Sequence, residues 1–375
     1  MAVDPETQGW DKTSYVAGMV GKPPLVHSRS GPLREAWRGI HEHAVRLTLS
    51  VRSRRLLLAA LVAVGSGTYV YFYARANPDF VSDFDQVWAG AAAVLRGENP
   101  YLVVGPRRAF HWAWPLYYPM PALLLALPLG MMPVVAARVV FAGVSAGLFA
   151  YALTRDDFAR WPAFISVSFM VNVELVQWSS LLAAAAMTPA LSWLACAKPN
   201  IGLAIAAAAS RWKSIVLVAG GAALLAAISF VVLPSWFHQW LENVRAAPHF
   251  RPPVTRPGGF LLLLGLLRWR RPEARFFCAL ACTPLTPTFY DPVLLYVVTR
   301  TTREALALSV GTVVLFFVIA ISAPTPILSV WGEVLAKASV WVIYMPCLVM
   351  LLRRPNEGDV PPYLAWLPGL RREND

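Results

Sequence analysis

Two carboxylates, Asp83 and Asp85, follow the first long apolar run of the chain and open a short segment that ends at Gly97. From Phe84 onward, apolar residues recur at the spacing of one helix face, which predicts a short amphipathic helix. A carboxylate at the boundary between water and membrane can accept a proton from a hydroxyl as a general base. Asp83 is the candidate for that role. Asp83 or Ser82 also fits the N-cap of this helix, with Gln86 three residues after Asp83 as in a capping box. Asp85 is interpreted as a solvated or salt-bridging neighbour that competes for the same role.

Two further ionisable residues stand within apolar sequence. Lys198 has apolar residues on both sides, and a charge at the centre of a spanning helix costs about 2.5–3.5 kcal/mol on insertion scales. It is therefore a candidate to stabilise an anionic phosphate, the alternative being a lysine that reaches from a helix end beside Pro199 to the interface. Asp291 precedes Pro292 and an apolar run, so it is either a site residue or an N-cap. Glu174 is a possible partner of Lys198.

Basic and aromatic residues alternate in two polar stretches that we expect on the outer face. This pattern fits an aromatic belt with lipid head-group contacts, and it also fits phosphate recognition by arginine with sugar stacking on tryptophan. The stretch from Pro234 to His249 could form a second interfacial helix over the site. The residues concerned are Arg107, Arg108, His111, Arg245, His249, Arg251 and Arg256, interleaved with Trp112, Trp114, Trp236 and Trp240.

The composition indicates a polytopic membrane protein. Of the 375 residues, 57% are hydrophobic and 14% are charged, whereas soluble domains carry about 25% charged residues. The net charge is +12, but the basic clusters flank apolar runs, which is typical of membrane topology and not of a nucleic-acid-binding face. The cysteines complete no zinc pattern and imply no disulfide framework, so we interpret all four as small buried apolar residues. They are Cys196, Cys278, Cys282 and Cys347.

The charge pattern also predicts how the chain is organised. Residues 1–55 form an arginine-bearing cytoplasmic tail, and the first span runs from Leu56 to Ala74. We expect a transmembrane domain over 56–352, with outer loops at 77–115 and 234–257, and a cytoplasmic tail over 353–375. Ten or twelve segments would place both termini inside. Several apolar runs are shorter than about 17 residues, which suggests broken segments around an internal polar site.

At this point a resemblance adds to the pattern. The stretch SDFDQVWAGAAAVLRGENPY resembles the first outer loop of glycosyltransferase family 87, with Asp83-Phe84, Gly97 and Pro100-Tyr101 at matching positions. Four further segments, in order, are similar to family motifs. They are YYPMPALLLALPLGMMPVVAARVV, VQWSSLLAAA with Val176 where the family has Gly, LACAKPNIGLAI with Lys198-Pro199 retained and Asn200 where the family has Gln, and TPLTPTFYDPVLLYVV with Tyr290-Asp291. The family often has a polar residue just before the Tyr-Asp pair, where this chain has Thr286 to Phe289.

The resemblance implies a GT-C-type all-helical membrane bundle of about 10–12 segments with amphipathic helices on the outer face. It implies an inverting transfer of a sugar, a mannose-like hexose, from a polyprenyl-phosphate donor to an envelope lipid or glycan acceptor. Asp83 would be the catalytic base. No nucleotide donor and no cofactor are implied, and a divalent metal is left open. The implied substrate-binding residues are Asp85, Arg107, Arg108, His111, Gln177, Lys198, Arg245, Tyr290 and Asp291.

Two other classes of function remain open at this stage. One is a non-catalytic membrane scaffold or partner subunit on the same fold, which the long N-terminal tail favours as a site for a protein partner. The other is a transporter or flippase, which would favour two related halves, and the sequence shows no such halves. In each case the chain is expected to lie in a bacterial-type inner membrane among membrane lipids, with its site facing outward and no nucleic-acid partner.

Overall fold

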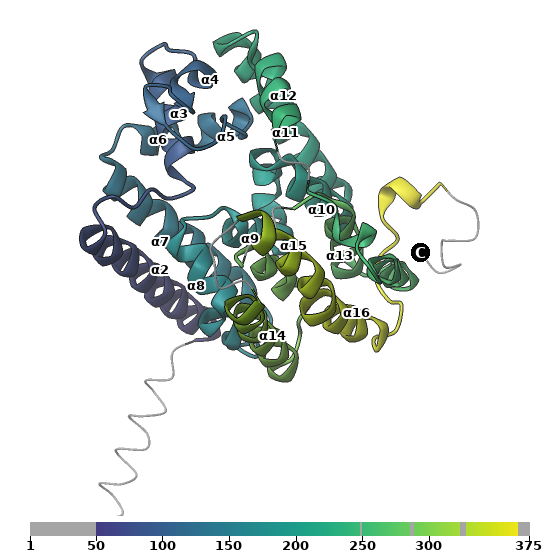
Figure 1. Ribbon diagram of the computed structural model, residues 1–375. Helices are drawn as coiled ribbons and strands as arrows, with labels where there is room; N and C mark the ends of the chain where they lie inside the picture. The colour runs from purple at the N-terminus through teal and green to yellow at the C-terminus, as the bar shows by residue number, and fades with distance from the viewer. Residues whose placement is uncertain (1–49, 248–249, 286–288, 323–327, 367–375) are drawn as a thin grey trace, which may run out of the picture. The chain divides into compact units, whose positions relative to one another are not determined.

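The computed structural model describes residues 50–247, 250–285, 289–322 and 328–366. Nearly all of the cytoplasmic tail expected at 1–55 lies outside these residues, as do His249, Thr286, Pro287 and Thr288. The described chain is mostly helical, as predicted, and Val51–Asp375 forms a single compact unit (Figure 1). Its only strands among these residues are a parallel pair in which Val104 lies opposite Phe110.

The helices alternate between long regular segments and short ones. The first half contains α2 (Val51–Ala76), α3 (Asp85–Leu95), α4 (Pro100–Val103), the strands β1 (Val104–Gly105) and β2 (Phe110–His111), α5 (Met120–Leu125), α6 (Leu127–Gly130), α7 (Val134–Leu153), η1 (Trp161–Ile165), α8 (Val167–Glu174) and α9 (Ser179–Met187). The second half contains η2 (Pro189–Ala197), α10 (Pro199–Ala208), α11 (Trp212–Val232), α12 (Trp236–Ala246), η3 (Pro253–Thr255), η4 (Gly259–Arg268), α13 (Pro272–Cys282), η5 (Asp291–Val297), α14 (Thr302–Ser322), α15 (Leu328–Ser339), the π-helical η6 (Val340–Tyr344), α16 (Met345–Leu352) and η7 (Pro362–Leu364). The other η elements are 3₁₀ helices.

Five helices of the described chain are long and apolar enough to cross a membrane, or six if the bent pair α8–α9 counts as one span. They are Val51–Ala76, Val134–Leu153, Trp212–Val232, Thr302–Ile321 and Gly332–Leu352. These helices support a multi-pass membrane protein. The expected ten to twelve segments are thus not ten to twelve full-length helices, because prolines divide much of the remaining apolar sequence into short pieces such as Pro199–Ala208. The first span also begins at Val51 and not at Leu56.

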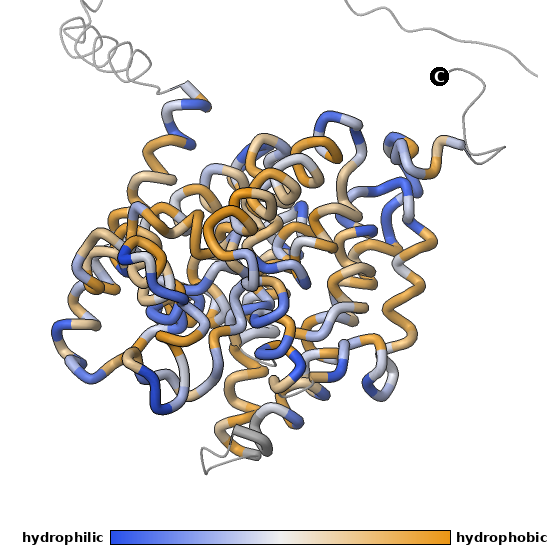
Figure 2. The backbone as a smooth tube through the Cα atoms, turned by 90° about the horizontal axis from the view of Figure 1, so that it is seen from above, coloured by the Kyte–Doolittle hydropathy of each residue, from blue (hydrophilic) through white to orange (hydrophobic). Residues whose placement is uncertain are grey.

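Apolar residues run along the helices, and hydrophilic residues gather at loops and ends (Figure 2). The helix α11 has almost no buried residues along its span, although it is the most hydropathic of the five. Phe230 and Val231 near its end are exposed. An apolar helix left uncovered by protein is what a bundle presents to lipid tails.

The helices α2 and α7 pack closely because small residues line their contact. A Cβ on Gly147 would lie 2.9 Å from the Cβ of Ala63 and 3.2 Å from the oxygen of Ala59. Close approach through small residues is the usual way in which membrane helices pack without a hydrophobic driving force. Arg55 near the start of α2 donates to the carbonyl of Tyr151 near the end of α7, so the two helices run antiparallel.

The predicted amphipathic helix after Asp83 is present as α3, and it packs against the bundle on α5, α6 and α7. The predicted second helix, α12, is also present and covers this region. Trp240 donates to the carbonyl of Tyr117 at 2.8 Å, and Asn99 donates to Gln239 at 3.0 Å. The two expected outer loops therefore form one cap over this end of the bundle, at the top of Figure 1.

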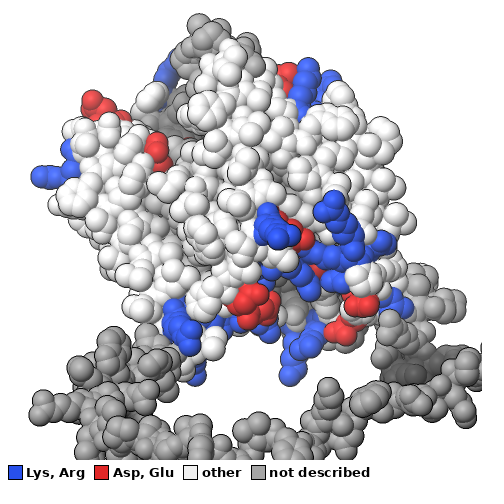
Figure 3. All heavy atoms as spheres, turned by 90° about the horizontal axis from the view of Figure 1, so that it is seen from below, with Lys and Arg blue, Asp and Glu red and all other residues white. Residues whose placement is uncertain are grey.

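The opposite end of the bundle is rich in arginine. Arg354 contacts Glu304, Arg300 contacts Glu273, and Arg268 donates to the carbonyl of Leu352. Figure 3 shows basic side chains gathered on this face. The basic loops that were expected on one side of the membrane thus lie together, and which side this is stays a prediction. The interpretation of the cysteines as buried holds for Cys278 and Cys347 and needs correction for the other two, because Cys282 is exposed at the end of α13 and Cys196 is only half-buried.

Candidate functional site

The break between α8 and α9 forms the floor of the site. The two helices meet at an angle of 118°, and Val176 within the break adopts a φ of 53°, in the left-handed region. The backbone N–H of Asp83 donates to the carbonyl of Leu175 at 3.2 Å. A β-branched residue rarely adopts this conformation, and such strain is usually found where the surrounding structure imposes it at a functional site.

Asp83 faces this break and does not cap α3. Its carboxylate accepts a hydrogen bond from the side-chain amide of Gln177. The N-cap of α3 is Phe84, which makes no side-chain capping hydrogen bond. The hydroxyl and the N–H of Ser82 both donate to Asp85, at 2.8 and 2.9 Å, so Ser82 does not cap the helix through its side chain either. Gln86 contacts only the carbonyl of Asp83. The N-cap interpretation of Asp83 is therefore wrong, and its carboxylate is left to act in the site.

The side chain of Lys198 also reaches Gln177, at the break between α8 and α9. It precedes Pro199 at the start of α10, and its ammonium donates to Oε1 of Gln177 at 3.1 Å. The ammonium also lies 5.6 Å from the ring centres of both Tyr118 and Tyr290. A lysine held in this way between an amide and two aromatic faces does not reach out to the interface, so the snorkelling alternative is wrong.

Asp291 is the second carboxylate of the site. It is the first residue of η5 and makes no capping hydrogen bond. Its Oδ1 accepts from the hydroxyl of Ser179, the first residue of α9, at 2.9 Å. Lys198 interacts electrostatically with both Asp83 and Asp291. The loop before α3, the break between α8 and α9, and the starts of α10 and η5 thus bring together two carboxylates, one amide and one ammonium that are far apart in sequence.

Burial governs the electrostatics of Asp83. It raises the pKa of this carboxyl above its ordinary value, and the neighbouring Asp85 raises it further. The positive charge of Lys198 and the hydrogen bond from Gln177 act in the opposite direction without overcoming the effect of burial. A carboxylate with a raised pKa is a stronger proton acceptor near neutral pH, as a general base requires.

Aromatic rings hold the two halves of the site together. Phe84 stacks on Phe141 of α7 with ring centres 4.4 Å apart, and Phe141 meets Trp178 at 4.8 Å. Trp178 in turn lies 6.2 Å from Tyr118. Since Phe84 and Trp178 are neighbours of Asp83 and Gln177 in sequence, this packing fixes the spacing of the two polar side chains.

Several buried polar atoms on residues near Asp83 or Gln177 in the chain have no hydrogen-bond partner in the described protein. They are Oε1 of Gln86, Nδ2 of Asn172 and Nε1 of Trp178. Gln86 contacts the carbonyl of Asp83, and the carbonyl of Asn172 accepts from the N–H of Gln177. Because buried polar groups are nearly always paired, these atoms are suited to meet a polar ligand.

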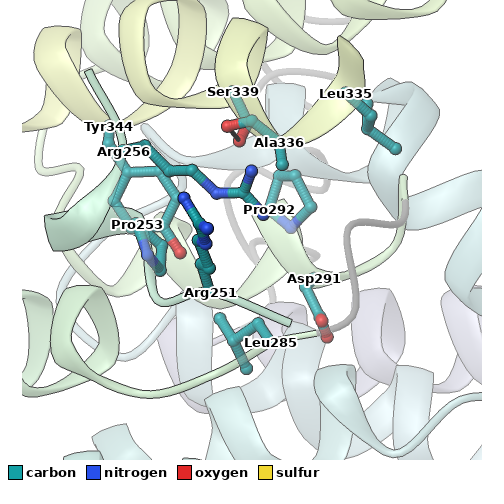
Figure 4. A pocket seen from close by; sticks show the side chains of 10 residues that line it. All are labelled: Arg251, Pro253, Arg256, Leu285, Asp291, Pro292, Leu335, Ala336, Ser339 and Tyr344. Atoms are coloured by element: carbon teal, nitrogen blue, oxygen red, sulfur yellow. Dashed lines mark hydrogen bonds between the residues drawn. The ribbon is translucent and has the colours of Figure 1, made fainter. Parts of the chain in front are cut away.

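A small pocket of about 40 Å³ opens beside Asp291 (Figure 4). Arg251 and Arg256 project into it, while the carboxylate of Asp291 points away from them. Arg256 is buried, and its Nε has no partner among the described residues, although its Nη1 contacts Glu333. The pocket therefore offers guanidinium groups close to the second carboxylate, which suits a phosphate.

Asp85 has both oxygens engaged within the protein. Besides Ser82, it contacts Nε of Arg138 at 2.7 Å and Nη2 of the same residue. Both side chains are buried, at 1% and 8% exposure. Of the two sequence interpretations, solvated or salt-bridging, the second is confirmed, and we assign Asp85 a structural role. The sequence analysis did not single out Arg138, an arginine within an apolar helix, although such a residue signals a buried partner.

The remaining candidates lie apart from this cluster. Arg107 is exposed on the β1–β2 turn and His111 is exposed in β2. Arg108 donates to the carbonyl of Val104, and Arg245 is exposed in the last turn of α12. No hydrogen bond or ion pair within the described chain joins them to Lys198, and their roles stay predictions. Glu174 accepts from the hydroxyl of Tyr69 at 3.0 Å, so its expected pairing with Lys198 is wrong.

The described residues contain no group of three or more His, Cys, Asp or Glu side chains placed to hold a metal ion. The expectation that no cofactor is used stays a prediction. No model of a protein family, no curated protein and no solved structure matches this chain. Its function is therefore argued from the geometry of the site.

Proposed function

We propose that this protein transfers a sugar from a polyprenyl-phosphate donor to a hydroxyl of an envelope lipid or glycan acceptor, with inversion at the anomeric carbon. The observation that carries the proposal is the placement of Asp83 and Asp291 around Lys198 at the break between α8 and α9. A carboxylate with a raised pKa, a nearby cation and unpaired polar atoms are the groups that such a transfer needs.

In the proposed reaction, the acceptor hydroxyl attacks the anomeric carbon while its proton passes to the carboxylate of Asp83. A new bond forms between the acceptor oxygen and the anomeric carbon, and the bond from that carbon to the phosphate oxygen breaks. The electron pair of the broken bond leaves with the polyprenyl phosphate. Gln177 positions the side chains of Asp83 and Lys198 relative to each other, because its amide donates to Asp83 and accepts from Lys198.

The leaving phosphate gains negative charge, and cations near its path would stabilise the transition state. Lys198 is one such cation, and Arg251 and Arg256 line the pocket beside Asp291. The unpartnered Nε of Arg256 supports a role in phosphate binding. Exposed apolar helices such as α11 offer the surface along which a prenyl chain could lie.

The test is transfer of a labelled sugar from a polyprenyl-phosphate donor by the full-length protein in liposomes. Asp83→Asn replaces the basic carboxylate with an amide of nearly the same shape, and we expect transfer to fall by about 10²–10⁴-fold. Asp79→Asn is the matched control, because Asp79 is exposed in the same loop. Transfer that survives Asp83→Asn at the level of the control would refute the proposal.

A further inference from the structure

A second and larger pocket lies at the arginine-rich end of the bundle. It has a volume of about 360 Å³, within the range of roughly 300–1,000 Å³ for small-molecule sites. Residues of α7, α9, α11, α13 and η5, or residues next to their ends, line it. Arg138 lies near the start of α7 and Arg155 just beyond its end, and a helix of this length spans about 30 Å. The second pocket is therefore remote from Asp85 and the site described above.

Four arginines line this pocket, against two acidic residues. The arginines are Arg155, Arg160, Arg211 and Arg300, and the acids are Asp156 and Glu273. Glu273 is shared, because Arg300, Arg271 and Arg354 all lie within 2.9–3.5 Å of its Oε1. Arg354 also contacts Glu304 at 2.8 Å and Arg271 lies 4.0 Å from Glu357, so the surplus of positive charge rests on the four lining arginines against the two lining acids.

Part of the positive charge of the pocket is buried and not exposed to water, as Arg160 shows. The residue is 8% exposed, and its Nε is buried without a partner in the described chain. Its Nη1 faces only the sulfur of Met187 at 3.7 Å, a weak acceptor, and its Nη2 contacts Asp156, an exposed side chain, at 3.0 Å. Burying a guanidinium with so few acceptors is costly unless an anion completes its hydrogen bonds.

The backbone adds to the positive potential. The first turn of α11 lines the pocket through Ser214, and the preceding Ser210 and Arg211 line it as well. The start of a 21-residue helix carries a partial positive charge and N–H groups that no residue of the helix can satisfy. Arginines beside a helix start form a common arrangement for binding phosphate oxygens.

We propose that this pocket binds a phosphate group, carried either by an anionic membrane lipid or by a soluble phosphate ester. The site is separate from the proposed sugar transfer and does not depend on it. Arg155 and Arg211 are the arginines to test, because both are exposed and their loss should not disturb the fold. Arg155 has no side-chain partner among the described residues, and Arg211 is 4.0 Å from an exposed Asp359.

The experiment uses the full-length protein in nanodiscs and has two arms. In the first arm, the discs contain phosphatidylcholine, and glycerol 3-phosphate is titrated while the unfolding temperature is followed. In the second arm, the discs contain phosphatidylglycerol, and the lipids that stay bound after extraction are counted by native mass spectrometry. The test variant is Arg155→Gln with Arg211→Gln. The control is Arg303→Gln, which removes an exposed arginine that does not line the pocket.

We expect wild type and the control to bind alike and the double variant to bind at least about tenfold more weakly, since hydrogen bonds to charged groups are lost. Binding in the first arm identifies a soluble phosphate ester, and binding in the second arm alone identifies a lipid head group. The absence of binding in both arms would overturn the proposal. An equal loss in the double variant and the control would do so too, because it would indicate general surface charge.

Discussion

Asp83 and Lys198 are held on opposite sides of one amide group, that of Gln177, which donates to the carboxylate and accepts from the ammonium. The three side chains come from the loop before α3, the break between α8 and α9, and the start of α10. The amide therefore holds the carboxylate and the ammonium near each other, although the two groups form no direct hydrogen bond. The carboxylate of Asp83 can thus accept a proton, while the nearby ammonium of Lys198 favours the ionised form of the carboxylate.

The first prediction concerns stability. Burial raises the pKa of Asp83, so the protonated form is favoured in the folded state. The contribution of this group to the free energy of unfolding is then full below its unfolded pKa and is lost as pH rises through its folded pKa. We therefore expect Asp83→Asn to be at least as stable as wild type at pH 7, with the advantage shrinking at acid pH. Thermal unfolding in one detergent at several pH values measures this, and a clear loss of stability at pH 7 would contradict it.

The second prediction concerns the pH dependence of transfer. A general base acts only when ionised, so the rate should rise with pH through the raised pKa of Asp83. Lys198 lowers that pKa, and Lys198→Gln should therefore shift the rise to higher pH while reducing the maximal rate. The readout is the pH profile of kcat/KM for wild type and variant. An unshifted profile with a lower rate would show that Lys198 does not act on Asp83.

The third prediction separates the two neighbouring aspartates. Asp85→Asn leaves the buried Arg138 without its charged partner, and we expect the free energy of unfolding to fall by about 3–5 kcal/mol. Arg138→Gln should have a similar cost. Replacing both residues with apolar ones of similar volume should restore much of the stability, because an unpaired buried charge is what is costly. Unfolding temperatures of the three variants check this, and equal losses in the double and single variants would refute it.

The fourth prediction concerns Val176, which adopts a φ of 53° and is 1% exposed. Val176→Gly and Val176→Ala both remove the branched side chain, so their difference isolates the backbone. At an ordinary helical position, alanine is the more stable by about 1 kcal/mol. Here we expect glycine to be the more stable by about 1 kcal/mol, because alanine is strained at positive φ. Unfolding of the two variants under identical conditions decides the order.

The predicted helix after Asp83 is present because amphipathic spacing and a stop at Gly97 are local properties. The sequence left Ser82 and Asp83 as alternative N-caps, since Ser82 with Asp85 and Asp83 with Gln86 have the same three-residue spacing, and neither side chain caps the helix. Arg138 on another helix engages Asp85, while Leu175 and Gln177 engage Asp83. Residue spacing cannot show which of the two pairs acts at the start of the helix, because Arg138, Leu175 and Gln177 are distant from it in the chain.

The sequence by itself determined the membrane class, the helical character and the clustering of basic loops, because hydropathy and charge act residue by residue along the chain. It also indicated Lys198 and Asp291, since ionisable residues within apolar runs are costly unless they are used. Only the tertiary structure decided that Gln177 joins Asp83 to Lys198, that Ser179 contacts Asp291, and that Glu174 contacts Tyr69 instead. Those choices depend on how broken helices meet in space, and hydrogen bonds between remote segments leave no periodic trace in the sequence.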